Sequence, residues 1–470
     1  MAAHFDLTPR DTKPIETKNR CIKTQIPVPE SFPLLREMER LEPDLQLAQP
    51  PIVWHHSEDG YKICDPYGNK WIDFSSSILM SNIGHGNPVI CDAIRKVVDK
   101  PMLDAFNFPT EERVEAAREF MSVCPIPDAK VFMLNAGSEA VEVAFRIMRI
   151  AGMKKSPTKK VVITFVNAYH GRTLASTMMG GTPEFKAWVT APDPDIYHAP
   201  WPESYDYPWA DPENPEYDED KMFQTFTDAI DKAGVKYDDI CGVFIESFFA
   251  PLCHKMPTSY AQKLREFCDE HDILLGMDEI QIGGCRSGKF WCFENYGIVP
   301  DMFCCGKGAS GSLPISAIYA RRELLDVFGP GGHATTHSGA PVVAAAAAAN
   351  IRYLRENRMW EAAAERGKIV EARFAEWKKQ YPHRIAYAGG IELGLSIMFA
   401  VKETHTPQPA FVDRLVKNCL DRGLLFSAPN NHGSNLRFVP PLNIPIDALE
   451  EGLDVFAEAL AQTDAEMPPY

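Results

Sequence analysis

Residues 273–308 read ILLGMDEIQIGGCRSGKFWCFENYGIVPDMFCCGKG. Two apolar runs in this stretch, 273–280 and 301–307, have the length and composition of short buried strands. Asp278 lies at the end of the first run, and Lys307 ends the second run between two glycines. A lysine there is either a solvated residue at a strand exit or an amine held inside a site, and this stretch alone favours the solvated residue.

The flanking sequence alternates between the two kinds of apolar pattern from about residue 90 to 330. The segments 138–152 and 257–272 have helical spacing, whereas 160–166 and 240–247 are β-branched or apolar runs of strand length. This alternation predicts the α/β fold class, with a mostly parallel sheet covered by helices.

Three charged residues are expected at the carboxyl ends of predicted strands: Glu246, Asp278 and Lys307. In parallel α/β sheets, sites form at this end of the strands. Three such residues of opposite sign in one sheet therefore predict a single cleft.

The composition argues against a nucleic-acid-binding, secreted or membrane protein. The 470 residues carry a formal net charge of −16 and show no basic cluster, which argues against nucleic-acid binding. The 12 cysteines form no CxxC pair, and residues 1–20 lack the pattern of a signal peptide, so we expect reduced thiols and a cytoplasmic location. No apolar run approaches the roughly 20 residues that span a bilayer, so no membrane contact is predicted.

Other segments of the chain do not follow the alternation of helical and strand patterns. Residues 1–50 are polar and proline-dotted, which predicts an arm, and 60–74 predict a β-hairpin around a Pro/Gly/Asn turn. The Pro-, Tyr- and Asp-rich segment 196–220 predicts a long loop, either a lid-like insertion or surface decoration. A long helix after residue 340 and a C-terminal αβ unit complete the chain.

Two motifs beside the strands offer further chemistry. In LNAGSEAVE (134–142), Gly137 and Ser138 open a predicted helix, so they either bind an anion such as phosphate or leave Ser138 as a simple N-cap. In NAYHGRT (167–173), an aromatic and a histidine can cover a flat ring, and Arg172 suits a carboxylate. The alternative for the second motif is a surface turn with a salt-bridged arginine.

Asp278 needs a cationic or hydrogen-bonding partner if it is buried, and a protonated pyridine nitrogen is one such partner. Glu279 is the alternative charged group in the same stretch. Pyridoxal 5′-phosphate (PLP) requires the groups that these motifs offer: an anion site for its phosphate, an aromatic side chain over its ring, an acid at its ring nitrogen and a lysine for its aldehyde.

The chain resembles the class III PLP-dependent aminotransferases of fold type I, most closely the 4-aminobutyrate and ornithine aminotransferase group. The resemblance runs from about residue 25 to 460. Its specific pieces are GSEAVE, YHGRT, residues 277–308, LPISAI, HATTHSGAP and LRFVPPL. It implies a large PLP-binding domain with a seven-stranded, mostly parallel sheet over 89–345. A smaller α/β domain would combine the N-terminal arm and adjoining residues 1–88 with the C-terminal part 346–470.

The resemblance also implies roles for individual residues. Lys307 would form the Schiff base with the cofactor, and Asp278 would pair with the pyridine nitrogen. The other expected cofactor contacts are Gln281 at the ring hydroxyl, Ile280 and Tyr169 on the two ring faces with His170 beside Tyr169, Gly137 and Ser138 at the phosphate, and Glu246. Thr336 would reach the phosphate of a neighbouring subunit, which implies a homodimer with shared active sites.

For substrates, the resemblance implies an amino donor and a 2-oxo acid. Arg172 would bind the distal carboxylate of an ω-amino acid, Arg437 would bind an α-carboxylate, and Ile78 is expected to contact substrate. We predict an aminotransferase acting on a 4-aminobutyrate-like ω-amino acid or a related amine. No metal site is predicted.

One departure from the family pattern keeps an alternative open. The strand-end glutamate of the relatives is followed by proline and, five residues on, by a second glutamate that shields the Arg437-type arginine. Here the corresponding positions hold Ser247 and Pro251. An amino-acid racemase or epimerase of the same fold, in which Arg437 always holds a carboxylate, needs no shielding acid. A degenerate, non-catalytic homologue is a third possibility, which Lys307 and Asp278 argue against.

Overall fold

The structure, a computed structural model, describes residues 5–43, 49–100, 102–202, 218–249, 253–401, 404, 406–427 and 433–467. The chain divides into two compact units. One contains Pro88–Trp360, and the other combines Met1–Asn87 with Glu361–Tyr470. The boundary expected after residue 345 lies inside helix α10 (Pro341–Glu356), whose apolar alanine face packs within the first of these units.

The Pro88–Trp360 unit is built on the expected seven-stranded sheet. Its strand order is β6 (Ala129–Leu134), β14 (Ser316–Arg321), β13 (Met302–Cys305), β12 (Leu274–Asp278), β9 (Ile240–Glu246), β7 (Val161–Phe165) and β8 (Ile196–Ala199). The pairs from β13 to β8 are parallel, and β14 runs antiparallel to both of its neighbours. The prediction of a mostly parallel sheet is therefore confirmed.

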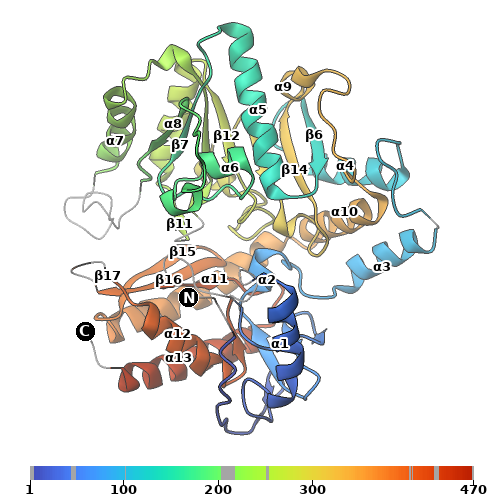
Figure 1. The fold of residues 1–470 in the computed structure, drawn as a ribbon, viewed down its shortest axis with the longest axis vertical. Coiled ribbons are helices and arrows are strands. Elements are labelled where there is room, and N and C mark those ends of the chain that lie inside the picture. Colours follow the sequence, from blue (N-terminus) through green and yellow to red (C-terminus); the bar gives the residue numbers. More distant parts are fainter. Residues whose placement is uncertain are drawn as a thin grey trace. The chain divides into compact units, whose positions relative to one another are not determined.

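Helices cover this sheet, as Figure 1 shows for the part of the chain coloured from light blue to orange. The helices of this unit are α3 (Pro88–Val98), which packs on α10, and α4 (Glu111–Ser122), α5 (Gly137–Lys155), α6 (Leu174–Met179), α7 (Glu219–Lys232), α8 (Thr258–Glu270), α9 (Arg322–Leu325) and α10 itself. The helix α5 packs its buried valines and alanines across β9, β13 and β14, while α8 packs on β12. Burial of these apolar side chains is the main driving force for the layer.

Side-chain alternation places the strand-end acids on the side of the sheet that faces α5. Leu274 of β12 and Phe244 of β9 belong to the core that α5 covers. Because successive side chains in a strand point to opposite faces, Asp278 and Glu246 point to the same side as these two residues. The two acids are also direct neighbours in the parallel ladder.

The segment 196–220 differs from its prediction as a loop. Residues Ile196–Ala199 form β8, which pairs in parallel with β7, because this short apolar run completes the edge of the sheet. Residues 203–217 lie outside the described part of the chain, and α7 begins at Glu219.

The other unit has two small sheets. The first contains β1 (Ile15–Glu16), β2 (Cys21–Ile22), β5 (Lys70–Asp73), β4 (Lys62–Cys64), β3 (His56–Glu58) and β18 (Leu424–Leu425). The second contains β15 (Ile385–Ile391), β16 (Gly394–Val401), β17 (Thr406–Pro407) and β19 (Asn435–Phe438). Pairing of β18 with β5 joins the C-terminal part of the chain to the N-terminal part, and the antiparallel β4–β5 pair confirms the predicted hairpin.

The helices of this unit are α1 (Phe32–Leu41), α2 (Ser76–Leu79), α11 (Met359–Gln380), α12 (Pro409–Leu420) and α13 (Ile446–Glu466). Over the described residues of the whole chain, no helix combines the length and the apolar character needed to cross a bilayer.

Replacing Gly152 of α5 with alanine is expected to lower the free energy of unfolding of the Pro88–Trp360 unit. A Cβ there would lie 2.2 Å from the Lys159 carbonyl oxygen and 2.4 Å from Cys241 Cβ, so the backbone has to shift. Overpacking of this kind costs about 1–3 kcal/mol or more, measured by urea unfolding. Met153→Ala, at the exposed neighbouring position, is the control and should change stability much less.

Candidate active site

A pocket of the Pro88–Trp360 unit gathers most of the predicted site residues. It is lined by Gly137, Ser138, Tyr169, His170, Gly171, Asp278, Ile280, Gln281 and Lys307. These residues come from the start of α5, from the turn after β7, and from the ends of β12 and β13. The pocket thus lies at the carboxyl ends of the parallel strands, where α/β sheets bind ligands.

Lys307 enters this pocket from a constrained backbone. It follows β13 after Gly306, and its φ of 39° lies in the left-handed region that a residue other than glycine rarely adopts. Such a conformation costs about 1–3 kcal/mol and is concentrated at functional sites. The reading of Lys307 as a merely solvated residue at a strand exit is therefore disfavoured.

Asp278 is buried with two hydrogen-bonding partners. Its Oδ1 accepts the backbone N–H of Ile280 at 2.9 Å, and its Oδ2 lies 2.8 Å from Nδ1 of His170. The other ring nitrogen of His170 lies 3.4 Å from Thr164 Oγ1, and Thr164 donates to the carbonyl oxygen of Met179. These contacts fix the carboxyl group against the side of the pocket.

The contact between His170 and Asp278 was not predicted. The sequence placed His170 only beside Tyr169, as part of an aromatic cover. In the structure His170 lines the pocket and also packs edge-on against Phe244, with ring centroids 4.9 Å apart. No local signal indicates this pairing, because 108 positions separate the two residues.

Glu279 has a structural position rather than one in the pocket. Its two carboxyl oxygens accept the backbone N–H groups of Cys292 and Phe293 at 2.9 and 3.0 Å, at the start of the short 3-10 helix Cys292–Tyr296. Burial raises the pKa of Glu279 to about 8. Of the two adjacent acids, Asp278 is therefore the one that faces the pocket.

The N-terminus of α5 forms another wall of the pocket. The helix begins at Gly137 with Ala136 as its N-cap, so Ser138 lies inside the first turn and is not the N-cap. Ser138 Oγ accepts the backbone N–H of Arg172 at 3.1 Å. The unpaired N–H groups of a first helical turn attract anions, and this helix has 19 residues.

Glycines allow the surrounding segments to approach this helix start. A Cβ on Gly137 would lie 2.9 Å from the Ile280 side chain, and one on Gly171 would lie 2.2 Å from Ser138 Oγ. Gly171 also has a φ of +131°, which side chains rarely tolerate. The turn after β7 and the end of β12 therefore close on α5 only with glycine at these two positions.

Tyr169 and Arg172 lie on the turn after β7. The backbone N–H of Tyr169 donates to Glu246 Oε2 at 3.0 Å, so Glu246 holds this turn against the end of β9. The exposed guanidinium of Arg172 lies 3.7 Å from the ring centroid of Phe185 and 5.4 Å from that of Tyr169. Arg172 thus makes cation–π contacts where a salt bridge was the alternative prediction.

The remaining predicted residues do not line this pocket. Thr336 is exposed, next to Thr335, whose Oγ1 accepts a hydrogen bond from Asn135 at 2.9 Å. Ile78 in α2 and Arg437 in β19 belong to the other unit, where Arg437 pairs in register with Ser396. Pro251 lies outside the described residues.

The fold is shared with a solved transaminase. The structure is similar to a transaminase from the marine bacterium Virgibacillus, with a TM-score of 0.79 at 23% identity over 89% of this chain and 94% of that one. The chain then matches the family described as aminotransferase class-III over residues 46–460, and it belongs to that family. Enzymes of this family depend on PLP, so the chain is a PLP-dependent transaminase.

Two relatives are similar along most of their length. The probable 4-aminobutyrate aminotransferase of Bacillus subtilis is 30% identical over 413 residues, which cover 86% of this chain and 91% of the relative. The 5-aminovalerate aminotransferase DavT of Pseudomonas aeruginosa is 30% identical over 418 residues, covering 87% and 93%.

The pocket residues suit this cofactor chemically. An amine at Lys307 and a buried carboxylate at Asp278 lie in the same pocket as the start of a long helix. They supply a nucleophile for an aldehyde, an acceptor for a protonated ring nitrogen and an anion site for a phosphate.

Replacing His170 with phenylalanine is expected to lower kcat by about ten- to a hundredfold, the value of a lost hydrogen bond to a charged group. Phenylalanine keeps a ring against Phe244 but cannot donate to Asp278. The measurement is kcat together with the absorption spectrum of the bound cofactor. His170→Asn, which restores a donor, should recover part of the loss, whereas no recovery and an unchanged spectrum would show a packing role only.

Proposed function

We propose that this transaminase moves an amino group from a 4-aminobutyrate-like ω-amino acid, or a related amine, to a 2-oxo acid. The observation that carries the proposal is the single pocket that holds Lys307, Asp278 and the first turn of α5. The printed names of two relatives, which act on 4-aminobutyrate and 5-aminovalerate, support donors with a terminal amino group.

Lys307 and Asp278 would carry the chemistry. When bound, PLP supplies an aldehyde for an amine and a ring that accepts the electron pair left when a substrate C–H bond breaks. The amine of Lys307 would carry the proton between the substrate carbon and the cofactor. The carboxylate of Asp278, oriented by His170, holds a proton at the ring nitrogen and so maintains the ring as an electron acceptor.

The other pocket residues would bind and orient the cofactor. Gly137 and Ser138 would hold the phosphate at the helix start, and Gln281 would reach the ring hydroxyl. Ile280 and Tyr169 would enclose the ring from two sides. Glu246 would act by fixing the turn that carries Tyr169, through the hydrogen bond at 3.0 Å.

Substrate recognition would use Arg172, Arg437 and Ile78. The guanidinium of Arg172 is exposed next to Tyr169, which supports a role at the distal carboxylate of the donor. For Arg437 the support is the likeness of its motif LRFVPPL to the family, and for Ile78 it is the family match over residues 46–460. The racemase or epimerase alternative loses support because the relatives that match over most of the chain are named as aminotransferases.

We also propose that the enzyme is a homodimer and acts in the cytoplasm. Thr336 lies exposed on a loop whose Ser338 Oγ accepts a hydrogen bond from Arg113 of α4 at 3.2 Å, and this exposure supports a contact with the phosphate of a second subunit. All 12 cysteines are free thiols, as expected in a reducing compartment.

A screen of half-reactions tests the proposed donor and reaction type. The holoenzyme is mixed with single donors, namely amines and β-, γ- and α-amino acids, and the cofactor spectrum is followed without any 2-oxo acid. We expect ω-amino acids to convert the cofactor to its amine form. A racemase would instead leave the cofactor unchanged while it inverts α-amino acids.

Arg437→Leu is expected to weaken kcat/KM for 2-oxo acids and α-amino acids by about 2 kcal/mol or more, because the α-carboxylate loses its partner. Donors without an α-carboxylate should be spared if another acid shields Arg437 in place of the missing glutamate at position 251. Equal loss for every reactive donor would indicate that Arg437 binds a substrate carboxylate in every half-reaction. No loss for any donor would exclude Arg437 from substrate binding.

A further inference from the structure

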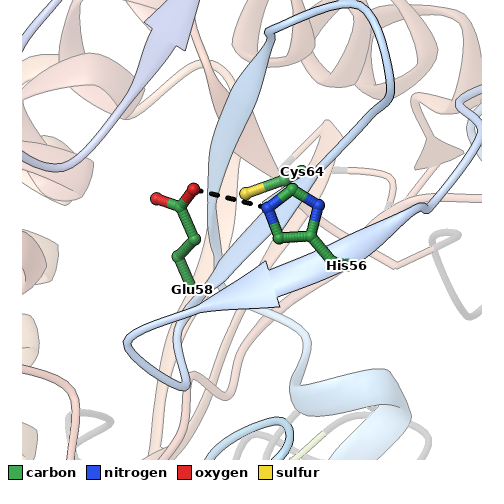
Figure 2. Close-up of side chains that lie close together, drawn as sticks. All are labelled: His56, Glu58 and Cys64. Atoms are coloured by element: carbon green, nitrogen blue, oxygen red, sulfur yellow. Dashed lines mark hydrogen bonds and ion pairs between the residues drawn. The ribbon is translucent and has the colours of Figure 1, made fainter.

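Three metal-ligating side chains meet on the β3–β4 hairpin, in the unit that does not contain the pocket. His56 lies directly opposite Cys64 in the antiparallel register, and Glu58 follows His56 by two residues. Alternation along β3 therefore brings His56 and Glu58 to the same face of the sheet. Figure 2 shows the three side chains turned toward one another.

The donor atoms are close enough for one ion. One donor atom from each residue lies within 4.8 Å of the other two, and His56 Nε2 is 3.4 Å from Glu58 Oε1. With metal–ligand bonds of about 2.0–2.3 Å, donor atoms in a tetrahedral zinc site lie roughly 3.5 Å apart. The His56–Glu58 pair already has this spacing. The His56 side chain is half-exposed and its ring meets the His55 ring edge-on, so closing on an ion requires a shift of about 1 Å toward Cys64 at the exposed side.

We propose that His56, Glu58 and Cys64 bind a divalent cation of the zinc type, with water as the fourth ligand. One imidazole nitrogen, one carboxylate oxygen and one thiolate sulfur form a mixed set that suits Zn²⁺, whereas Mg²⁺ and Ca²⁺ prefer oxygen ligands alone. Binding replaces the thiol proton of Cys64 with the metal and releases that proton to solvent.

Lys70 completes the surroundings of the site. Lys70 lies in β5, directly opposite Cys64 of β4 in the register. Its ammonium lies 2.7 Å from Glu58 Oε2. Because Lys70 takes Oε2, Oε1 stays directed toward His56 and available to a cation, as expected of an outer partner that orients a ligand.

Charge balance is compatible with this arrangement. The Glu58 carboxylate and a Cys64 thiolate neutralise the two charges of the ion, and Lys70 keeps its pairing with the outer carboxylate oxygen. Without metal, the same residues form only a His56–Glu58–Lys70 cluster at the surface beside a buried thiol. Metal affinity distinguishes these two arrangements.

The test uses the tag-free, full-length holoenzyme after treatment with a chelator and desalting. ZnCl₂ is titrated by calorimetry, and CoCl₂ is followed by its visible absorption, at wavelengths longer than those of the cofactor. We expect one equivalent of tightly bound metal per chain. His56→Gln and Cys64→Ser should each weaken the affinity by at least about 100-fold, since changes to outer partners alone cost 10–100-fold.

Cys91→Ser, which removes a half-buried thiol from α3, is the matched control and should bind as the parent does. No tight equivalent in the parent, or unchanged affinity in His56→Gln, would overturn the proposal. His56 is exposed, so this variant remains decisive if Cys64→Ser fails to fold. Amino transfer is measured on the same samples. A parent protein without amino transfer would contradict the proposed function, whereas a parent that transfers amino groups but binds no metal would contradict the metal site alone.

Discussion

Lys307→Ala is expected to lose amino transfer by at least about 10⁴-fold, the upper range for a general acid–base group, because the variant lacks the amine that moves the proton. The protein should still fold and bind PLP through the helix start and the ring contacts. The measurement is kcat with a reactive donor, together with borohydride reduction, which should fix the cofactor to the parent and not to the variant.

The control for this variant is Lys289→Ala, which removes an exposed lysine from the same segment of the chain. It should keep its activity and its reducible cofactor. Turnover near that of the parent in Lys307→Ala would contradict the role given to Lys307, and loss of folding in the variant would be recognised by thermal unfolding.

Asp278→Asn is expected to lower kcat by about 10³-fold, comparable to the removal of one preorganised electrostatic contact at a reacting centre. The amide has no negative charge to hold a proton at the ring nitrogen. The single amide oxygen can still accept from the Ile280 N–H, and the NH2 group then faces His170 Nδ1, which accepts in the other neutral tautomer, so the fold and the helix start should be kept. The measurement is kcat and cofactor affinity on the same preparation.

Glu279→Gln is the matched control, because it changes the neighbouring acid that faces Cys292 and Phe293. This substitution should alter the unfolding free energy more than the chemistry. If Asp278→Asn keeps almost full activity, Asp278 is a structural group and the cofactor ring must be oriented differently in the pocket.

Local patterns were sufficient to predict the strands that carry the site. Apolar runs of strand length at 240–247, 273–280 and 301–307 correspond to β9, β12 and β13. Such runs can be recognised without tertiary information because a strand buried on both faces must be apolar throughout. The gathering of Asp278 and Lys307 in one pocket was also predictable, because parallel strands end at the same edge.

Local patterns were insufficient wherever a residue depends on a distant partner. Ser138 had the residue type of an N-cap, yet α5 starts one residue before it and its hydroxyl accepts from Arg172. For Arg172 the alternative was a salt bridge at a surface turn, and the guanidinium instead lies over the ring of Phe185. The segment 196–199 was expected to be loop, but the free edge of β7 recruits it into the sheet.

The sequence by itself determined the family motifs, the strands β7, β9, β12 and β13 of the large sheet and the residues at their ends, because these depend on side-chain type and on short-range spacing. The tertiary structure decided which side chains face one another. It placed His170 on Asp278 and aligned His56 with Cys64 on the hairpin. The physical reason is that hydrogen-bond geometry and strand register are set when separate segments pack together, and neither leaves a mark in the local apolar pattern.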